Sequence, residues 1–284
     1  MRLLLSLCLA FTSLASQGHA QHSIPPDIVQ QKHVVPETGN EVWVYHPREL
    51  PSKKLPCILI APAGSRIFHG MPLADGDVPE HLPYVRAGFV VIAYAVDGEF
   101  DGDYLNRQAY AAAKAYASAD GGLKDAFNAL KFTLVNYDFV DPSRIYVAGH
   151  SSAATIALAL AHRSKSIRGC VACSPCCDVT DRLGNDIVQD INLRVSGFAK
   201  FVREHCPTLN VANFECPVFV FNALDDLNTT PDKIRRFVTK LEGNGVDVTQ
   251  KTTASGGHYG SMIEEGVPAG IEWLLELDAA VQEK

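Results

Sequence analysis

Residues 144–154 read RIYVAGHSSAA, and this stretch decides how the rest of the chain is interpreted. A run of β-branched and aromatic residues leads into Gly149 and His150, two serines follow, and an alanine-rich apolar segment comes next. The pattern predicts a buried strand, a tight turn and a helix. A serine at the start of a helix can cap a free backbone N–H group, or it can stand on the turn as a nucleophile. The choice between these two roles depends on whether residues elsewhere in the chain can activate the serine.

Short apolar runs alternate with longer helix-compatible segments over most of the chain. The runs at residues 90–96, 144–149, 167–173 and 216–223 are rich in β-branched residues and bounded by turn residues, which predicts buried strands. The alternation of strand and helix predicts an α/β fold with a mostly parallel central sheet flanked by helices. In such sheets, functional groups gather at the carboxyl ends of the strands.

The composition is that of a globular protein with a large core, since 47% of the 284 residues are hydrophobic and 20% are charged. The formal net charge is −7, and the lysines and arginines form no stripe that could follow phosphate groups. Nucleic acid is therefore not an expected partner.

The first 20 residues, MRLLLSLCLAFTSLASQGHA, predict a secretory signal peptide cleaved after Ala20 or Ala15, because one arginine precedes an apolar run and small residues. That run is short for a membrane span, and no later stretch is long enough for one. We expect residues 21–284 to form a single domain that is secreted or periplasmic. Of the eight cysteines, one lies in this leader. The remaining seven predict disulfide bonds, with Cys206 and Cys216 as one candidate pair, and at least one unpaired thiol.

A serine nucleophile needs a base, and that base needs a third group to orient it. The strand predicted at residues 216–223 runs into Asp225 and Asp226, which delivers a carboxylate to the carboxyl end of the strand. Further on, SGGHYG places His258 on a glycine-rich loop before a final helix. Ser151, Asp225 and His258 follow one another in the order that the nucleophile-elbow fold requires.

Together these segments resemble the α/β-hydrolase superfamily and, within it, the dienelactone-hydrolase and prolyl-oligopeptidase-like branch of serine hydrolases. The stretches that carry the resemblance are LPCILIAPAGS, YVRAGFVVIAYAVDG, LKDAFNALKF, VDPSRIYVAGHSSAA, CPVFVFNALDD and GGHYG, in the order of the family. The resemblance covers most of the chain after the leader. It implies an α/β-hydrolase fold and a catalytic triad of Ser151, Asp225 and His258.

The resemblance also bears on which carboxylate completes the triad. Members of this branch place it three residues after a position usually held by glycine, here Asn222, which selects Asp225. Asp226 is then a neighbour that stabilises the loop. Some α/β-hydrolases instead take the acid from the end of the preceding strand, which would nominate Asp178 or Asp181.

An oxyanion hole needs two N–H groups aimed at the oxygen that becomes negative. One is expected from Ser152, the residue after the nucleophile. The second is expected from Gly64 or Ser65, in a loop where relatives often carry His-Gly-Gly and this chain has Pro-Ala-Gly-Ser. The alternative is that this loop is only a tight turn. Residues 178–216 are longer than a crossover needs, and they are expected to form a small helical, cap-like insertion near the active site or else a surface crossover.

Two further segments contain residue types that can bind metals. Residues 97–103, DGEFDGD, resemble the first half of a calcium loop, but Gln108 stands where that loop has a glutamate, and an acidic surface loop is the alternative. The cysteines of GCVACSPCC, residues 169–177, are not expected to bind a metal, because two of them fall on opposite faces of a strand. His150 is expected to shape the turn at the nucleophile.

The sequence thus predicts a secreted serine hydrolase that cleaves small-molecule or short-chain carboxylic esters through an acyl-enzyme, with no metal or organic cofactor. A peptidase of the prolyl-oligopeptidase type is the nearest alternative. Such relatives usually carry a large N-terminal propeller, whereas fewer than 60 residues precede the first core strand here. The alternative from another class is a binding module without catalysis. The sequence predicts no oligomeric state.

Overall fold

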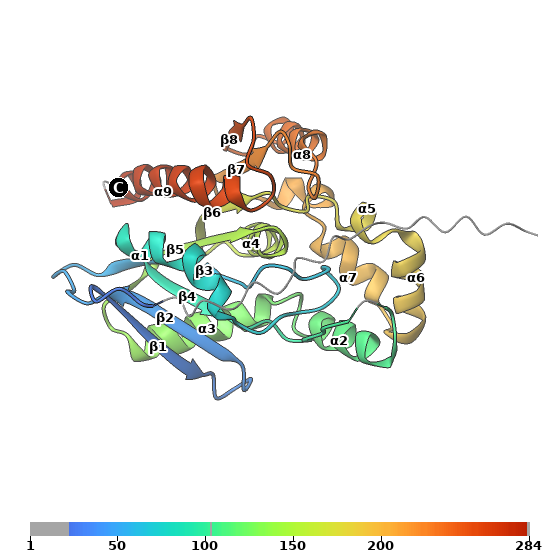
Figure 1. Cartoon of the computed structure of the whole chain (residues 1–284), viewed down its shortest axis with the longest axis horizontal. Coiled ribbons are helices and arrows are strands. Elements are labelled where there is room, and N and C mark those ends of the chain that lie inside the picture. Colours follow the sequence, from blue (N-terminus) through green and yellow to red (C-terminus); the bar gives the residue numbers. More distant parts are fainter. Residues whose placement is uncertain (1–22, 103, 283–284) are drawn as a thin grey trace, which may run out of the picture.

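The computed structural model describes residues 23–102 and 104–282 and shows a twisted sheet between layers of helices (Figure 1). The eight strands lie in the order β1-β2-β4-β3-β5-β6-β7-β8. They are β1 (Ile28–Val34), β2 (Glu41–Pro47), β3 (Leu55–Ile60), β4 (Val90–Tyr94), β5 (Val140–His150), β6 (Ile167–Cys173), β7 (Val218–Ala223) and β8 (Val248–Thr253). β2 runs antiparallel to β1 and to β4, and the other neighbouring pairs are parallel.

The sheet confirms the predicted α/β fold. The four apolar runs identified in the sequence correspond to β4, β5, β6 and β7. β4 and β7 are buried over their whole length, because helices cover both faces of the sheet there. β8 lies at the edge and is mostly exposed, in keeping with its polar sequence VTQKTT.

Helices cover the sheet in two layers. They are α1 (Val78–Arg86), α2 (Arg107–Ser118), α3 (Leu123–Asn136), α4 (Ser152–Arg163), α5 (Val179–Leu183), α6 (Asn185–Arg194), α7 (Phe198–His205), α8 (Pro231–Gly243) and α9 (Val267–Gln282). α1 and α9 contribute to the hydrophobic core on one face, and α3, α4 and α8 contribute to the core on the other. These five helices thereby bury their apolar sides against the sheet.

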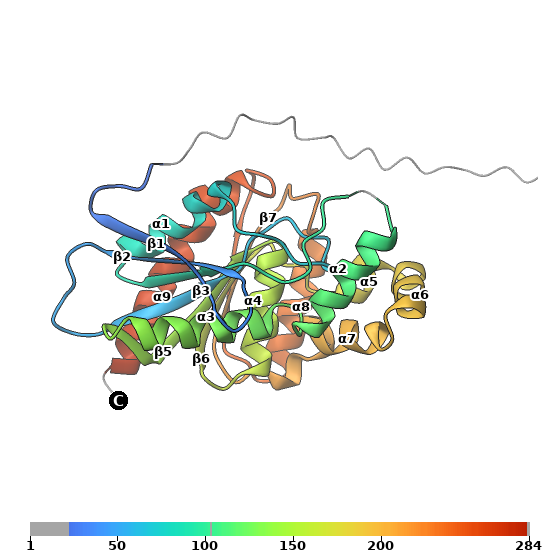
Figure 2. The same ribbon diagram turned by 90° about the horizontal axis from the view of Figure 1, so that it is seen from below.

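Residues 178–216 contain α5, α6 and α7, followed by the short 3-10 helices η2 (Pro207–Leu209) and η3 (Val211–Asn213). α5, α6 and α7 lie beside α2, beyond the carboxyl edge of the central strands (Figures 1 and 2). The two segments are far apart in the sequence but share a third hydrophobic cluster, which includes Ala109 and Ala113 of α2 and Phe198 and Val202 of α7. This insertion is therefore packed against the body of the protein rather than extended into solvent.

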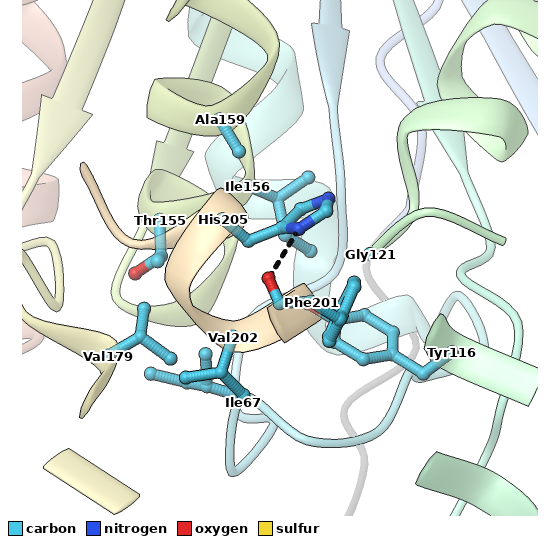
Figure 3. Close-up of a pocket in the computed structure, with 10 residues that line it drawn as sticks. All are labelled: Ile67, Tyr116, Gly121, Thr155, Ile156, Ala159, Val179, Phe201, Val202 and His205. Atoms are coloured by element: carbon cyan, nitrogen blue, oxygen red, sulfur yellow. Dashed lines mark hydrogen bonds between the residues drawn. The ribbon is translucent and has the colours of Figure 1, made fainter. Parts of the chain in front are cut away.

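His205 at the end of α7 joins the insertion to the turn between α2 and α3. Its Nδ1 lies 2.9 Å from the Phe201 carbonyl oxygen, and its Nε2 lies 2.9 Å from the Asp120 carbonyl oxygen. The Asp120 carboxylate also lies 3.0 Å from Nε2, and the hydrogen bond from His205 holds the pKa of Asp120 below its usual value. Figure 3 shows His205 at one side of a small apolar pocket whose walls include Ile67, Val179 and Phe201.

Some sequence predictions concern the export of the chain. The predicted leader, residues 1–20, lies outside the described residues. Across the described part of the chain, no helix combines the length and the apolar character needed to cross a bilayer.

The seven cysteines from Cys57 to Cys216 all have free thiols, so the expected disulfide does not form among them. Six of the seven are buried, where they act as small apolar side chains.

Candidate active site

The turn between β5 and α4 places Ser151 at the carboxyl edge of the sheet. Ser151 has φ +55° and ψ −119°, a backbone conformation that is costly for a residue other than glycine. Its N–H donates to the Cys173 carbonyl oxygen at 2.9 Å, and its own carbonyl oxygen accepts from the N–H of Thr155 at 3.2 Å. These bonds hold the backbone of the turn on both sides, so the side chain projects away from the sheet.

The Ser151 hydroxyl does not cap α4, since no hydrogen bond joins it to the first turn of the helix. Its Oγ instead lies 2.9 Å from Nε2 of His258. His258 comes from the loop between β8 and the π-helical turn η4 (Met262–Gly266). The structure therefore brings together the two residues that the sequence analysis assigned as nucleophile and base.

Asp226 orients His258, with its Oδ2 at 2.8 Å from Nδ1 of the imidazole. A carboxylate can only accept, so Nδ1 carries the proton and Nε2 is left as the acceptor for the Ser151 hydroxyl. Asp226 is buried and also accepts from the N–H groups of Asn228 at 2.8 Å and Thr229 at 3.1 Å. Burial alone would raise the pKa of Asp226, but the bond with His258 and these N–H groups hold it well below its usual value. The carboxylate is thus charged at neutral pH.

The prediction that Asp225 is the triad acid is wrong in this structure. Asp225 is exposed, and its two carboxylate oxygens accept from the N–H groups of Gly256 at 3.1 Å and Gly257 at 2.9 Å. The N–H of Asp226 donates to the Ala223 carbonyl oxygen at 3.3 Å, and this turn points the second aspartate inward rather than the first. Asp225 acts on His258 only through the glycine loop that carries it.

The two alternative acids do not bond to His258. Asp178 caps α5, where its carboxylate accepts from the N–H of Asp181 at 3.0 Å. Asp181 forms an ion pair with Lys233. Both aspartates therefore stabilise the insertion.

The loop after β3 differs from the expected arrangement. The N–H groups of Gly64 and Ser65, which were expected to face an oxyanion, both lie 3.0 Å from the side-chain Oγ of Ser152. The N–H of Ser152 belongs to the first turn of α4, where backbone N–H groups have no partner within the helix. The oxyanion role of the Ser152 N–H stays a prediction, while the N–H groups of Gly64 and Ser65 bind the Ser152 hydroxyl instead.

Short-range bonds and the insertion hold the same loop in place. The Ser65 hydroxyl donates to the His69 carbonyl oxygen at 2.8 Å and accepts from the N–H of Ile67 at 2.8 Å. Ile67 has φ +68°, which is strained for a β-branched residue. Its side chain lies against Val202 in the pocket between loop and insertion (Figure 3). Packing thus compensates for the strain, and the insertion supports the loop beside Ser152.

His150 and Glu80 form a buried pair behind the nucleophile. The sequence analysis predicted a structural role for His150 but did not identify Glu80. Nε2 of His150 lies 2.9 Å from the His258 carbonyl oxygen, so it must donate, and its Nδ1 faces Oε1 of Glu80 at 3.8 Å. Burial lowers the pKa of His150 to about 4, and burial, with the nearby Asp77 charge, raises the pKa of Glu80 to about 8. Both side chains are therefore neutral near pH 7. His150 shapes the site by holding the backbone at His258.

The acidic loop at residues 97–103 makes structural contacts in its described part. Oδ1 of Asp97 accepts from the Asn40 amide at 3.0 Å, and the N–H of Asp97 donates to the Asp125 carboxylate at 3.0 Å. Asp103 lies outside the described residues. Within residues 23–102 and 104–282, no group of three or more His, Cys, Asp or Glu side chains is arranged to hold a metal ion.

The family model described as the prolyl oligopeptidase family matches residues 80–276, which is more than half of the chain. The chain belongs to this family of serine hydrolases. The match includes the elbow, both neighbouring aspartates and His258, and it confirms the resemblance inferred from the sequence motifs. A search of curated proteins gives no match.

Solved structures of the same fold include both peptidases and esterases. An acylaminoacyl peptidase of Pyrococcus horikoshii matches with a TM-score of 0.65 and 15% identity, covering 88% of this chain but only 41% of that one. A dienelactone-hydrolase candidate from Klebsiella pneumoniae matches at TM-score 0.63 and 14% identity, covering 89% and 98% of the two chains. A propionate-bound thermophilic esterase from Thermogutta terrifontis matches at 0.64 and 14%, covering 89% and 95%. This chain thus spans about two fifths of the length of the peptidase.

The two neighbouring aspartates provide a matched test of the triad. Asp226→Asn should lower kcat by about 10³- to 10⁴-fold, because an amide in this place favours the wrong imidazole tautomer. Asp225→Asn should cost at most about tenfold, since Asp225 only positions the glycine loop. Steady-state kinetics of the two folded variants measure both effects. A larger loss of kcat for Asp225→Asn would restore Asp225 as the triad acid.

Glu80 should make stability depend on pH. Its folded-state pKa of about 8 lies above the unfolded value near 4.5, so the folded state holds the extra proton between these values and wild-type stability falls as pH rises. Glu80→Gln removes this loss, so its stability relative to wild type should rise between about pH 4.5 and 8, by at most about 1.4 kcal/mol per pH unit.

Urea unfolding at several pH values measures this trend, with the exposed Glu264→Gln variant as the matched control. Asp77, His150 and Tyr259 near Glu80 are present in all three proteins, so the comparison removes only the Glu80 carboxyl and its electrostatic interactions with these groups. A stability difference for Glu80→Gln that is no steeper than that of the control would show that Glu80 is ionised in the folded protein at neutral pH.

Proposed function

We propose that this serine hydrolase cleaves carboxylic esters through an acyl-enzyme, and that it acts after export from the cytoplasm. The observation that carries the catalytic part is the continuous chain from Ser151 Oγ through His258 to Asp226, with both distances below 3 Å. The secretory leader expected at residues 1–20 supports the proposal of export.

The reaction follows from the proton positions in this chain. Ser151 Oγ attacks the ester carbonyl carbon while its proton passes to Nε2 of His258, and the charged Asp226 stabilises the imidazolium. The carbonyl oxygen becomes an oxyanion next to the N–H of Ser152. When the tetrahedral intermediate collapses, the C–O bond to the alcohol breaks and His258 returns the proton to the leaving oxygen. Water then attacks the acyl-Ser151 ester by the same steps, which releases the acid.

The surroundings of the triad favour an apolar substrate group. Leu224 and Leu227, on either side of the two aspartates, have exposed fractions of 60% and 93%, and Tyr259, next to His258, has 48%. Large apolar side chains that are exposed on the loops carrying catalytic residues are typical of a ligand-binding surface. They suit the alkyl or acyl part of an ester.

Two of the structural neighbours support esters over peptides. The esterase and the dienelactone-hydrolase candidate match over nearly their whole length, and the esterase is described with propionate bound. The family match and the acylaminoacyl peptidase neighbour favour the second candidate, a serine peptidase, which would use the same triad. An alkoxide is a better leaving group than an amide nitrogen, so the same site meets a lower barrier with esters.

Labelling and a substrate panel test the proposal together. A fluorophosphonate probe should label the wild-type protein at Ser151 and should not label Ser151→Ala. Short-chain esters should have kcat/KM values at least about 10²-fold above those of proline-containing dipeptide amides of similar size.

The outcomes separate the candidates. Amide hydrolysis that equals or exceeds ester hydrolysis would favour the peptidase. Failure of folded wild-type protein to label and to hydrolyse any of these substrates would leave a binding module without catalysis.

A further inference from the structure

The hydroxyl of Ser152 has an unusual place for the residue after a nucleophile. Its Oγ accepts two hydrogen bonds, from the N–H groups of Gly64 and Ser65, each at 3.0 Å. Ser152 has an exposed fraction of only 3%, so its hydroxyl is almost removed from bulk water. Acyl transfer as proposed involves the N–H of Ser152 and gives its side chain no role.

The two incoming bonds determine what the hydroxyl can still do. A serine oxygen has two lone pairs, and the two N–H groups occupy both. The hydroxyl hydrogen is then free to be donated, and among the described residues no acceptor bonds to it. A buried donor without an acceptor costs free energy, so a site that keeps one is suited to a ligand atom that accepts.

Covalent geometry places that hydrogen near the oxyanion. Oγ and the backbone nitrogen of Ser152 are separated by only two carbon atoms, so they lie about 3 Å apart in a gauche rotamer and less than about 4 Å apart in the trans rotamer. The N–H of Ser152 is the group next to the nucleophile that an oxyanion on the Ser151 adduct would reach. An oxygen that accepts from this N–H is therefore also within reach of the Ser152 hydroxyl.

We propose that the Ser152 hydroxyl is the second donor of the oxyanion hole, held and polarised by the N–H groups of Gly64 and Ser65. The proposal rests on acyl transfer at Ser151. It replaces the direct N–H donor that the sequence predicted in this loop with a side-chain donor that the loop supports.

The loop is built to hold the hydroxyl in one position. The Ser65 side chain bonds to the His69 carbonyl oxygen and to the N–H of Ile67, and the N–H of Arg66 lies 3.2 Å from Nε2 of His69. Donors fixed before the reaction need no reorganisation when the charge develops, which is the main source of oxyanion-hole catalysis. Hydrogen bonds accepted by a hydroxyl also strengthen the bond that it donates.

A purely structural role makes the opposite prediction. If Ser152 only tethered the loop, its removal would free the N–H groups of Gly64 and Ser65 to face the oxyanion directly. Activity would then be unchanged or higher. The sign of the change in kcat therefore separates a donor from a tether.

The experiment compares Ser152→Ala, Ser152→Thr and wild type on the best wild-type substrate, whether ester or amide. Ser152→Ala should lower kcat about 10²- to 10³-fold with little change in KM, as expected for a lost oxyanion donor. Ser152→Thr keeps the hydroxyl and should recover most of that loss. The matched control is Ser174→Ala, because Ser174 is also buried and its hydroxyl has no hydrogen-bond partner among the described residues.

A second readout is the inhibition constant of a boronic acid that mimics the tetrahedral adduct. For Ser152→Ala it should rise by about the factor by which kcat/KM falls. If the alanine variant does not fold, Ser152→Cys replaces it, since a thiol is a weak donor of similar shape, and it should lose at least about tenfold in kcat relative to Ser152→Thr.

Each outcome has one meaning. An active wild type with Ser152→Ala equal to it or faster would overturn the donor role and leave the triad intact. An equal loss for the alanine and threonine variants would also overturn it. A wild type that neither turns over substrate nor reacts with the fluorophosphonate would overturn the proposed function and the role of Ser152 with it.

Discussion

The close approach of β5 to α4 at Gly149 is the constraint on which the active site depends. A Cβ atom at Gly149 would lie 2.4 Å from the backbone carbon of Ala153 and 2.6 Å from the nitrogen of Ala154, closer than real side chains come. The absence of a side chain at Gly149 therefore lets the strand turn directly into the helix. This tight turn gives Ser151 a positive φ, and its side chain therefore projects above the sheet.

Three successive residues of this turn, His150, Ser151 and Ser152, contact the His258 loop, α1 and the loop after β3. His150 donates to the backbone of His258 and faces Glu80 of α1, Ser151 meets the His258 imidazole, and the Ser152 side chain binds the loop after β3. The loop that carries the base and the loop that holds the Ser152 hydroxyl are therefore positioned relative to the nucleophile by direct bonds to it and its neighbours.

The sequence predicted the parts of this arrangement that depend on local pattern. Strand and helix alternation indicated the parallel sheet, and the small residues around Ser151 and the glycines before His258 marked the turn and the loop. The choice between Asp225 and Asp226 has no such signal, because both follow β7 and only the turn closed by Ala223 decides which one faces inward. Glu80 and the bonds to Ser152 depend on packing between distant segments, which no local pattern encodes.

The central claim is that Ser151 forms a covalent acyl intermediate, that His258 accepts and returns its proton, and that Asp226 orients and stabilises the imidazole. The most direct test is mass spectrometry of the intact protein, quenched with acid during turnover of an activated short-chain ester. The account predicts a mass increase equal to one acyl group, located by peptide mapping on Ser151 and absent from Ser151→Ala. Turnover of the ester without any acyl adduct on Ser151, or with the adduct on another residue, would contradict it.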